Sequence, residues 1–277
     1  MKKNTAEKND MSLSYYDSPH GTRIAYCFTP GKTDRDTSPG IVFLGGFRSD
    51  MNGTKARFLE QICAQSGQSY LRFDYGGHGS SSGVFEQGTV GSWKQDAVDI
   101  IDHVFAQRGV VLVGSSMGGW IALRLLLERL VQVKGVIGIA AAPDFTRDIK
   151  NRMTSPERAS LTRNGYLELP SAYAETPYIV TRALLEDGER QAVLDKVHEI
   201  QVPLVLIHGK QDADVSWKKA RDTATAFKGP DTRVLLIDEA GHRLSKPENL
   251  RVIANELARI SATACTYTKR NTNQRQR

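Results

Sequence analysis

Short continuous apolar runs alternate with helical patterns along most of this chain, and that alternation is the strongest constraint on its fold. Each run holds four consecutive mainly apolar residues, as expected for strands that are buried on both faces of a sheet. Amphipathic stretches of about 10–15 residues between the runs predict βαβ units, whose right-handed crossovers place helices on both faces. The runs are 41–44, 70–73, 110–113, 136–139, 204–207 and 234–237.

A hairpin is expected before the first of these runs. Residues 12–17 and 23–28 flank the turn Ser18-Pro19-His20-Gly21, which predicts two antiparallel strands. With the six runs, the fold class is therefore α/β, with a mostly parallel eight-stranded sheet. Helices are expected near 54–66, 92–106, 117–130, 216–227 and 247–260.

The alternation breaks once, between Pro143 and Val202. This segment has no comparable strand run, yet a structureless loop of such length is rare in a compact domain. We expect a small, mostly helical cap insertion over 144–200, within a single domain that spans 12–262. The polar ends, 1–11 and 263–277, are expected to be disordered tails.

The net charge of +6 lies mainly in the two ends of the chain. Residues 1–12 carry +1 and residues 261–277 carry +4, so the remaining body is near neutral and predicts no nucleic-acid partner. No apolar run approaches the roughly 18 residues of a membrane helix, so no stable membrane insertion is expected. Glu7 and Asp10 do not fit a secretory or transit leader, which favours a cytoplasmic location.

The cysteine and histidine patterns point to chemistry without a metal or cofactor. Three cysteines without a CxxC pair exclude a disulfide framework and a thiolate zinc site. No HExxH, GxGxxG or Walker-type motif occurs. Cys27 and Cys63 are expected to be buried reduced thiols, and Cys265, near the tail, receives no role.

The most informative motif is Gly114-Ser115-Ser116-Met117-Gly118, which matches G-x-S-x-G. It follows an apolar strand and opens an apolar helix, which is the context that a nucleophilic serine on a strained turn requires. Ser116 is therefore the expected nucleophile. Ser115 has the wrong register for this role.

A serine hydroxyl needs a base, and in this architecture an acid and then a histidine follow later in the chain. His242, in the loop after the last strand, is the expected base. Asp212, in the loop after the preceding strand, is the favoured acid, with Asp144 and Asp214 as alternatives. Four other histidines are expected to be solvated or packed side chains without a catalytic role, and His208 is expected to make structural hydrogen bonds. They are His20, His103, His198 and His208.

Two backbone N–H groups are expected to form an oxyanion hole. One belongs to Met117, directly after the nucleophile, and the other to Phe47 in the loop after the first parallel strand. Paired glycines before Phe47 allow the backbone to approach a substrate carbonyl closely. Side chains expected near the substrate are Arg48, His78, Tyr173 and Tyr178, although packing is the simpler explanation for the tyrosines.

These motifs together resemble the α/β-hydrolase superfamily. The likeness covers about residues 15–260 and is greatest to the branch of mitochondrial palmitoyl-protein thioesterases, which also cleave acyl glucuronides, and their bacterial relatives. It implies an α/β-hydrolase fold in which Ser116, Asp212 and His242 hydrolyse an acyl ester or thioester. The matching segments are 40–44, 46–47, 50–56, 72–75, 89–93, 114–120, 138–140, 169–173, 208–209 with Asp212, and 242–243.

We therefore predict a serine hydrolase without cofactors that cleaves a carboxylic ester or an acyl thioester through an acyl-enzyme. The substrate is a small-molecule acyl ester or thioester, or an S-acylated protein. Two alternatives share the triad: a cofactor-free perhydrolase or C–C hydrolase, and a receptor-like binding protein with vestigial turnover. The nucleophilic serine disfavours the dehalogenases of this fold, which use aspartate.

Overall fold

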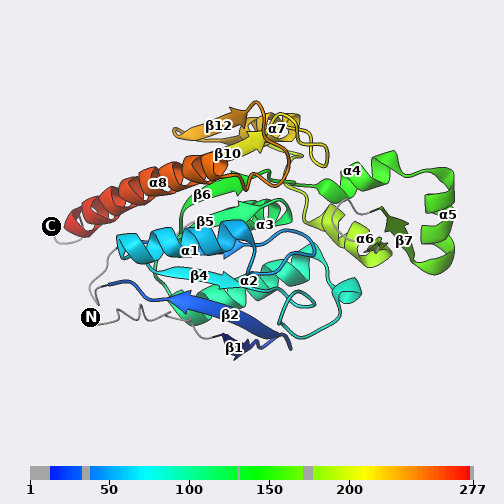
Figure 1. The fold of residues 1–277 in the computed structure, drawn as a ribbon, viewed down its shortest axis with the longest axis horizontal. Helices are drawn as coiled ribbons and strands as arrows, with labels where there is room; N and C mark the ends of the chain where they lie inside the picture. Colours follow the sequence, from blue (N-terminus) through cyan, green and yellow to red (C-terminus); the bar gives the residue numbers. More distant parts are fainter. Residues whose placement is uncertain (1–12, 33–37, 130–131, 171–176, 275–277) are drawn as a thin grey trace, which may run out of the picture.

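Eight strands form the central sheet in the order β1-β2-β4-β3-β5-β6-β10-β12 (Figure 1). The computed structural model describes residues 13–32, 38–129, 132–170 and 177–274. β2 pairs antiparallel with β1 and with β4, and all other neighbours in the sheet are parallel. The predicted sheet is thus confirmed. Its strands are β1 (Ser14–Asp17), β2 (Arg23–Thr29), β3 (Gly40–Leu44), β4 (Tyr70–Phe73), β5 (Val110–Ser115), β6 (Val133–Ile139), β10 (Leu204–Gly209) and β12 (Thr232–Ile237).

Helices cover both faces of the sheet because successive strand side chains point to opposite sides. In β3, for example, Ile41 and Phe43 join the core beneath α1 and α8, whereas Val42 and Leu44 join the core beneath α2 and α3. The elements on the two faces are α1 (Thr54–Ser66), α2 (Val90–Phe105), α3 (Met117–Glu128), α7 (Lys218–Ala226) and α8 (Pro247–Gln274), with a 3₁₀ turn, η1 (Phe85–Gln87), before α2.

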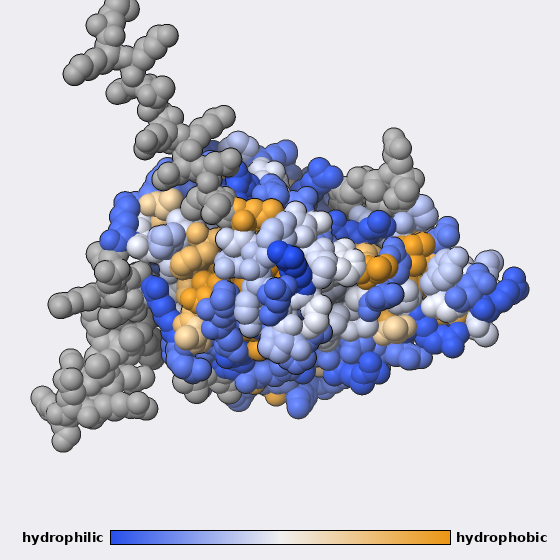
Figure 2. Space-filling model, turned by 90° about the horizontal axis from the view of Figure 1, so that it is seen from below, coloured by the Kyte–Doolittle hydropathy of each residue, from blue (hydrophilic) through white to orange (hydrophobic). Residues whose placement is uncertain are grey.

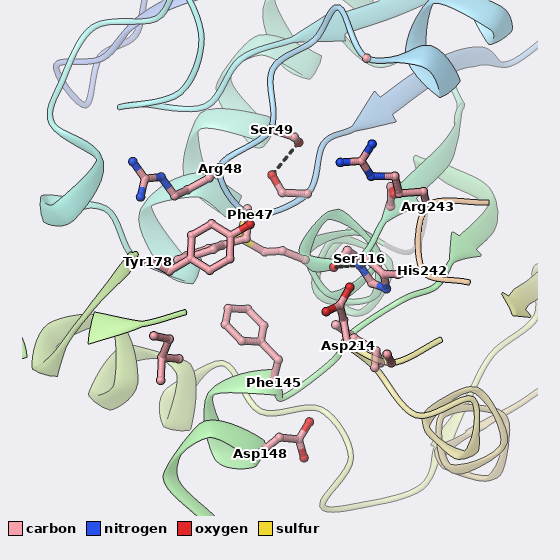
Figure 3. A pocket seen from close by; sticks show the side chains of 18 of the residues that line it. Phe47, Arg48, Ser49, Ser116, Phe145, Asp148, Tyr178, Asp214, His242 and Arg243 are labelled. Atoms are coloured by element: carbon pink, nitrogen blue, oxygen red, sulfur yellow. Dashed lines mark hydrogen bonds between the residues drawn. The ribbon is translucent and has the colours of Figure 1, made fainter. Parts of the chain in front are cut away.

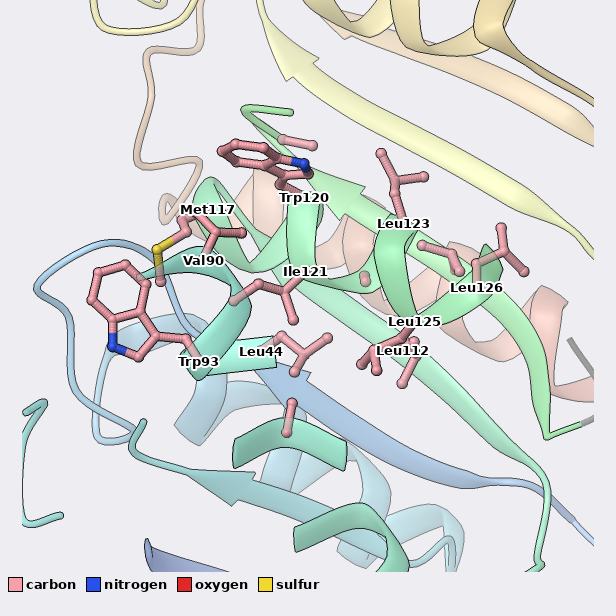
Figure 4. Close-up of a cluster of buried hydrophobic side chains, with 14 of the residues drawn as sticks. Leu44, Val90, Trp93, Leu112, Met117, Trp120, Ile121, Leu123, Leu125 and Leu126 are labelled. Carbon is pink, nitrogen blue, oxygen red and sulfur yellow. The ribbon is translucent and has the colours of Figure 1, made fainter. Parts of the chain in front are cut away.

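α3 is apolar on nearly all sides and lies in the middle of this core (Figure 4). Trp120 and Ile121 are fully buried, and the Trp120 indole donates a hydrogen bond to the Gln191 carbonyl at 3.0 Å. A helix packed on all sides cannot shift without opening cavities in the core. The turn that precedes α3 therefore has a rigid support.

α8 differs from the prediction. The helix expected near 247–260 is longer than predicted and continues to Gln274, into the segment expected to be a tail. No Gly or Pro occurs after residue 262, so the sequence contains no strong signal to end a helix there. The side chain of Cys265 and the tail at 1–11 lie outside the described residues.

The cap predicted over 144–200 contains a small sheet as well as helices. Strands β7 and β8 pair antiparallel between the second and third helices of this segment. Because β7 and β8 are short and only half-buried, they lack the continuous apolar runs that mark the central strands. The elements are α4 (Phe145–Arg152), α5 (Ser155–Asn164), β7 (Tyr166–Leu169), β8 (Tyr178–Thr181), α6 (Arg182–Arg190) and β9 (His198–Glu199), which pairs with β11 (Phe227–Lys228).

The described surface is mostly polar, with a few exposed apolar side chains. Among the described residues, no helix is both long and apolar enough to cross one. On the face shown in Figure 2, apolar side chains form separate groups between hydrophilic ones. The large apolar side chains exposed on the described part of the chain are Leu13, Tyr15, Val84, Tyr166 and Val197.

Candidate active site

Ser116 lies on a strained turn between β5 and α3. Its φ of 54° is a left-handed value that side chains other than glycine rarely adopt. The turn is possible because the chain comes very close to itself: a Cβ atom on Gly114 would lie 2.2 Å from the Gly118 carbonyl oxygen. A Cβ atom on Gly118 would lie 2.1 Å from the Leu44 carbonyl oxygen. The two glycines of the motif are therefore sterically required.

His242 lies between this serine and a buried aspartate. Its Nε2 atom is 3.2 Å from Ser116 Oγ, and its Nδ1 atom is 2.8 Å from Asp212 Oδ2. The three residues come from the loops after β5, β10 and β12, whose carboxyl ends meet at one edge of the sheet. The structure thus brings Ser116, His242 and Asp212 together as the sequence predicted.

The Asp212 carboxylate accepts four hydrogen bonds although its side chain is completely buried. Oδ1 accepts from the backbone N–H groups of Asp214 at 2.9 Å and Val215 at 2.8 Å. Oδ2 accepts from His242 and from His208 Nε2, which lies 3.0 Å away. Burial raises the pKa of Asp212, but the bonds from His208, His242 and Val215 outweigh it and hold this pKa well below the usual value. Asp212 is therefore ionised and oriented at neutral pH.

Neither alternative acid has this position. Asp144 accepts hydrogen bonds from the backbone N–H groups of Val193 at 2.9 Å and Leu194 at 3.0 Å, so its carboxylate anchors the far end of the cap. Asp214 is exposed and reaches the cavity beside His242.

One group of side chains at this place could in principle hold a metal ion. It consists of Asp212, Asp214 and His242, whose ligand atoms lie within 4.8 Å of one another. The hydrogen bonds to both Asp212 oxygens fit a catalytic acid better than a metal ligand.

The loop after β3 lies against the nucleophile. A Cβ atom on Gly46 would be 3.4 Å from Ser116 Cβ, so only the hydrogen atoms of this glycine separate the loop from the serine. Phe47 and Met117, the predicted oxyanion donors, both line the cavity. Figure 3 shows Phe47 in this position. The structure thus places both residues beside Ser116.

A cavity of about 630 Å³ opens over Ser116 between the sheet edge and the cap. One side is aromatic, where Phe47, Phe145 and Tyr178 surround the space (Figure 3). Asp214, His242 and Arg243 lie on the other side. The remaining apolar lining includes Met117, Ile149, Leu169, Pro170 and Val180, and the remaining polar lining includes Asp50, Thr54 and Lys55.

Of the four predicted pocket side chains, Arg48 and Tyr178 line the cavity. The Arg48 guanidinium lies over the Tyr178 ring at 5.8 Å and donates a hydrogen bond to the Pro177 carbonyl at 3.1 Å, which links the loop after β3 to the cap. Tyr173 lies outside the described residues.

His78 does not line the cavity, contrary to the prediction. It is 3% exposed and lies among the rings of Tyr75, Phe85 and Trp93. Burial lowers the pKa of His78 to about 4, so the ring is neutral at physiological pH. Its Nε2 atom accepts a hydrogen bond from the Arg48 backbone N–H at 3.2 Å. His78 lies in a glycine-rich loop, 76–79, but aromatic residues enclose its ring and separate it from the cavity.

Lys55 is a cavity residue that the sequence did not indicate. It lies in the first turn of α1 and donates a hydrogen bond to the Arg243 carbonyl at 2.6 Å. Burial, together with the charge of Arg243, lowers the pKa of Lys55 to about 8.

The sequence also did not indicate that His208 contacts Asp212. This contact depends on how the loop after β10 folds back towards the strand.

Comparison with known proteins agrees with this geometry. A profile described as "Alpha/beta hydrolase family" matches residues 41–252. The chain belongs to the alpha/beta hydrolase family. The mitochondrial palmitoyl-protein thioesterase ABHD10 of Homo sapiens is 33% identical over 243 residues, which cover 87% of this chain and 78% of the human protein. The predicted resemblance to this branch of the family is thereby confirmed.

Solved structures extend the comparison. A chain from Agrobacterium vitis S4, described as a hydrolase, superposes with a TM-score of 0.86 at 36% identity, over 90% of this chain and 98% of that one. Mouse alpha/beta hydrolase domain-containing protein 10 gives a TM-score of 0.83 at 31% identity, over 91% and 99%. Est1E from Butyrivibrio proteoclasticus, solved with ferulic acid, shares the fold with a TM-score of 0.75 at 18% identity over 91% and 99%.

Proposed function

We propose that this chain is a serine hydrolase that cleaves a carboxylic ester or an acyl thioester through an acyl-enzyme. The observation that carries the proposal is the continuous chain of contacts from Ser116 Oγ through His242 to the buried Asp212 carboxylate. The relatives named as palmitoyl-protein thioesterases support thioesters among the substrates.

In the proposed reaction, His242 Nε2 removes the proton of Ser116 as Oγ attacks the acyl carbonyl carbon. The tetrahedral oxyanion accepts hydrogen bonds from the Phe47 and Met117 backbone N–H groups. Asp212 stabilises the imidazolium, which then protonates the leaving alcohol or thiol. Water, activated by the same imidazole, attacks the acyl-enzyme, and the acid leaves while Ser116 regains its proton.

The two sides of the cavity suggest how the substrate lies. His242 has to reach the leaving group, so the alcohol or thiol belongs on the side with Asp214 and Arg243. The acyl chain then lies among Phe47, Phe145 and Tyr178 under the cap. Hydrophobic burial favours acyl chains of more than two carbons there. A small ester, an acyl thioester and an S-acylated protein all fit this division.

The relatives are named as mitochondrial, and a cytoplasmic location for this chain stays a prediction.

Labelling with a fluorophosphonate tests the proposal. The wild-type chain is expected to form a covalent adduct and Ser116→Ala to form none, while Ser115→Ala, which removes the neighbouring hydroxyl, remains reactive. A wild-type chain without labelling or turnover would overturn the hydrolase and favour a binding protein.

Aryl esters of increasing acyl length, acyl thioesters and an acyl glucuronide then define the substrate class. Turnover that requires hydrogen peroxide would favour the perhydrolase alternative. Cleavage of a β-diketone in place of an ester would favour the C–C hydrolase.

A further inference from the structure

The loop from Gly46 to Ser49 has the form of a tight turn beside the nucleophile. The Ser49 N–H donates to the Gly46 carbonyl at 3.1 Å, and the Ser49 hydroxyl donates to the same oxygen at 2.7 Å (Figure 3). Arg48, the third residue of the turn, has a φ of 55°. A type II turn requires a positive φ at this position and usually has glycine there. An arginine in this conformation persists only where its surroundings hold it.

Two hydrogen bonds hold this turn, one on each side of Phe47. On one side, Ser49 fixes the direction of the Gly46 carbonyl. The C=O and N–H groups of one trans peptide point in opposite directions, so this bond also aims the Phe47 N–H away from Ser49. On the other side, His78 Nε2 accepts the Arg48 N–H, which belongs to the next peptide group.

The surroundings of His78 suit an acceptor. Its Nδ1 atom lies 3.2 Å from the Gly76 carbonyl, which selects the tautomer with the proton on Nδ1 and leaves Nε2 free of hydrogen. The rings of Tyr75, Phe85 and Trp93 keep the imidazole in place.

We propose that His78 and Ser49 are positioning residues that fix the two peptide groups flanking Phe47 and so aim its N–H at the oxyanion. This inference rests on the proposed function, since it presumes that Phe47 is an oxyanion donor. In this role His78, which does not line the cavity, acts through the Arg48 N–H, and Ser49, which does line it, acts through the Gly46 carbonyl. Complete loss of one such donor lowers the rate by about 100- to 1,000-fold, so a misdirected donor is expected to cost less.

A matched pair of variants tests His78. Gln in this position carries an acceptor oxygen near the place of Nε2, whereas Met has a similar length and no comparable acceptor. For hydrolysis of 4-nitrophenyl acetate, His78→Met is expected to lower kcat by about 10- to 100-fold with KM within about twofold, and His78→Gln to recover most of the loss. The affinity for phenylboronic acid, which forms a tetrahedral anionic serine adduct, should fall in parallel with kcat.

Ser49 provides a second test at an exposed position, where folding is not at risk. Ser49→Ala is expected to lower kcat by about three- to tenfold, because the backbone N–H of residue 49 still holds the carbonyl, and Ser49→Thr should restore it. Ser66→Ala is the matched control, since Ser66 makes the same type of bond to the carbonyl three residues earlier, at the far end of α1. Its kcat should not change.

The outcomes separate the two proposals. If wild type reacts with the fluorophosphonate while His78→Met and Ser49→Ala keep full kcat and boronate affinity, positioning is overturned and the hydrolase stands. If His78→Met does not fold, the Ser49 variants decide. Equal kcat values for Ser49→Ala and Ser49→Thr would still overturn the positioning proposal. An inert wild type overturns both.

Discussion

The sheet edge and the cap meet at the same cavity, but they are built differently. Nine of the twelve residues of α3, directly behind Ser116, are buried, whereas α5 in the cap has no buried residue. The inner side of the cap joins the main core through buried side chains such as Leu184 and Leu185, and Gly91 N–H donates a hydrogen bond to the Asp187 carboxylate at 2.6 Å. A packed core holds reacting groups in place, while the exposed outer layer of the cap, α5, tolerates change. We infer that the chemistry belongs to the sheet edge and the choice of acyl chain to the cap.

The largest expected effect is that of Asp212→Asn on the sheet edge. An amide in place of the carboxylate stabilises the wrong imidazole tautomer of His242, so kcat should fall by about 10⁴-fold with little change in KM. Steady-state kinetics on a short aryl ester measures this. Asp144→Asn, the matched control, should lower stability and leave kcat within about tenfold. The reverse pattern would make Asp144 the catalytic acid.

The next effect compares two glycines. Gly114→Ala on the sheet edge would place a Cβ atom 2.2 Å from backbone oxygen, and we expect a loss of about 3 kcal/mol in the free energy of unfolding. Gly165→Ala in the cap meets no atom within 4 Å and has only the strain of its φ of 79°, about 1 kcal/mol. Urea denaturation measures both. Equal losses would contradict the difference in rigidity.

Phe145→Ala tests the acyl side of the cavity. The Phe145 ring packs against Phe47 and Trp120 at centroid distances of 5.7 and 5.5 Å. Its removal should lower kcat/KM for an octanoyl ester by about 10- to 100-fold, since burial of such a group contributes about 2 kcal/mol. The acetyl ester should change much less, and Phe145→Leu should be intermediate. An equal loss for both esters would place the acyl chain elsewhere.

The smallest effect is a pH dependence at Lys55. Because the pKa of this lysine is lowered to about 8 in the folded chain, the unfolded chain binds its proton more tightly between about pH 8 and the ordinary lysine value near 10.4. The free energy of unfolding of wild type should therefore rise with pH through this window relative to Lys55→Met. Urea denaturation at pH 7 and pH 9.5 measures the difference. A constant difference would mean that Lys55 has an ordinary pKa.

Much of the fold could be predicted because its signals are local. Each central strand is a continuous apolar run, and the glycines around Ser116 mark a turn that tolerates no side chain. The cap hairpin of β7 and β8 could not be predicted in this way, because its strands are short and partly exposed. The end of α8 was misplaced since polarity alone does not stop a helix.

The choice of acid shows where sequence reasoning stops. Asp144 and Asp212 both follow strands, β6 and β10, that are parallel neighbours and end at the same edge of the sheet. Chain order therefore admits both. Only the fold shows that backbone N–H groups of the cap hold Asp144, whereas His208 and His242 contact Asp212.

The sequence by itself determined the sheet, the turn at Ser116 and the order of serine, acid and histidine, because periodicity and steric limits act between near neighbours. The tertiary structure alone decided that His78 lies behind the loop from Gly46 to Ser49 rather than in the cavity, and that Lys55 lines the cavity. Such contacts join segments far apart in the chain, for example Arg48 with His78, and they form only when the sheet brings its loops to one edge. Their physical cause is the packing of the whole domain.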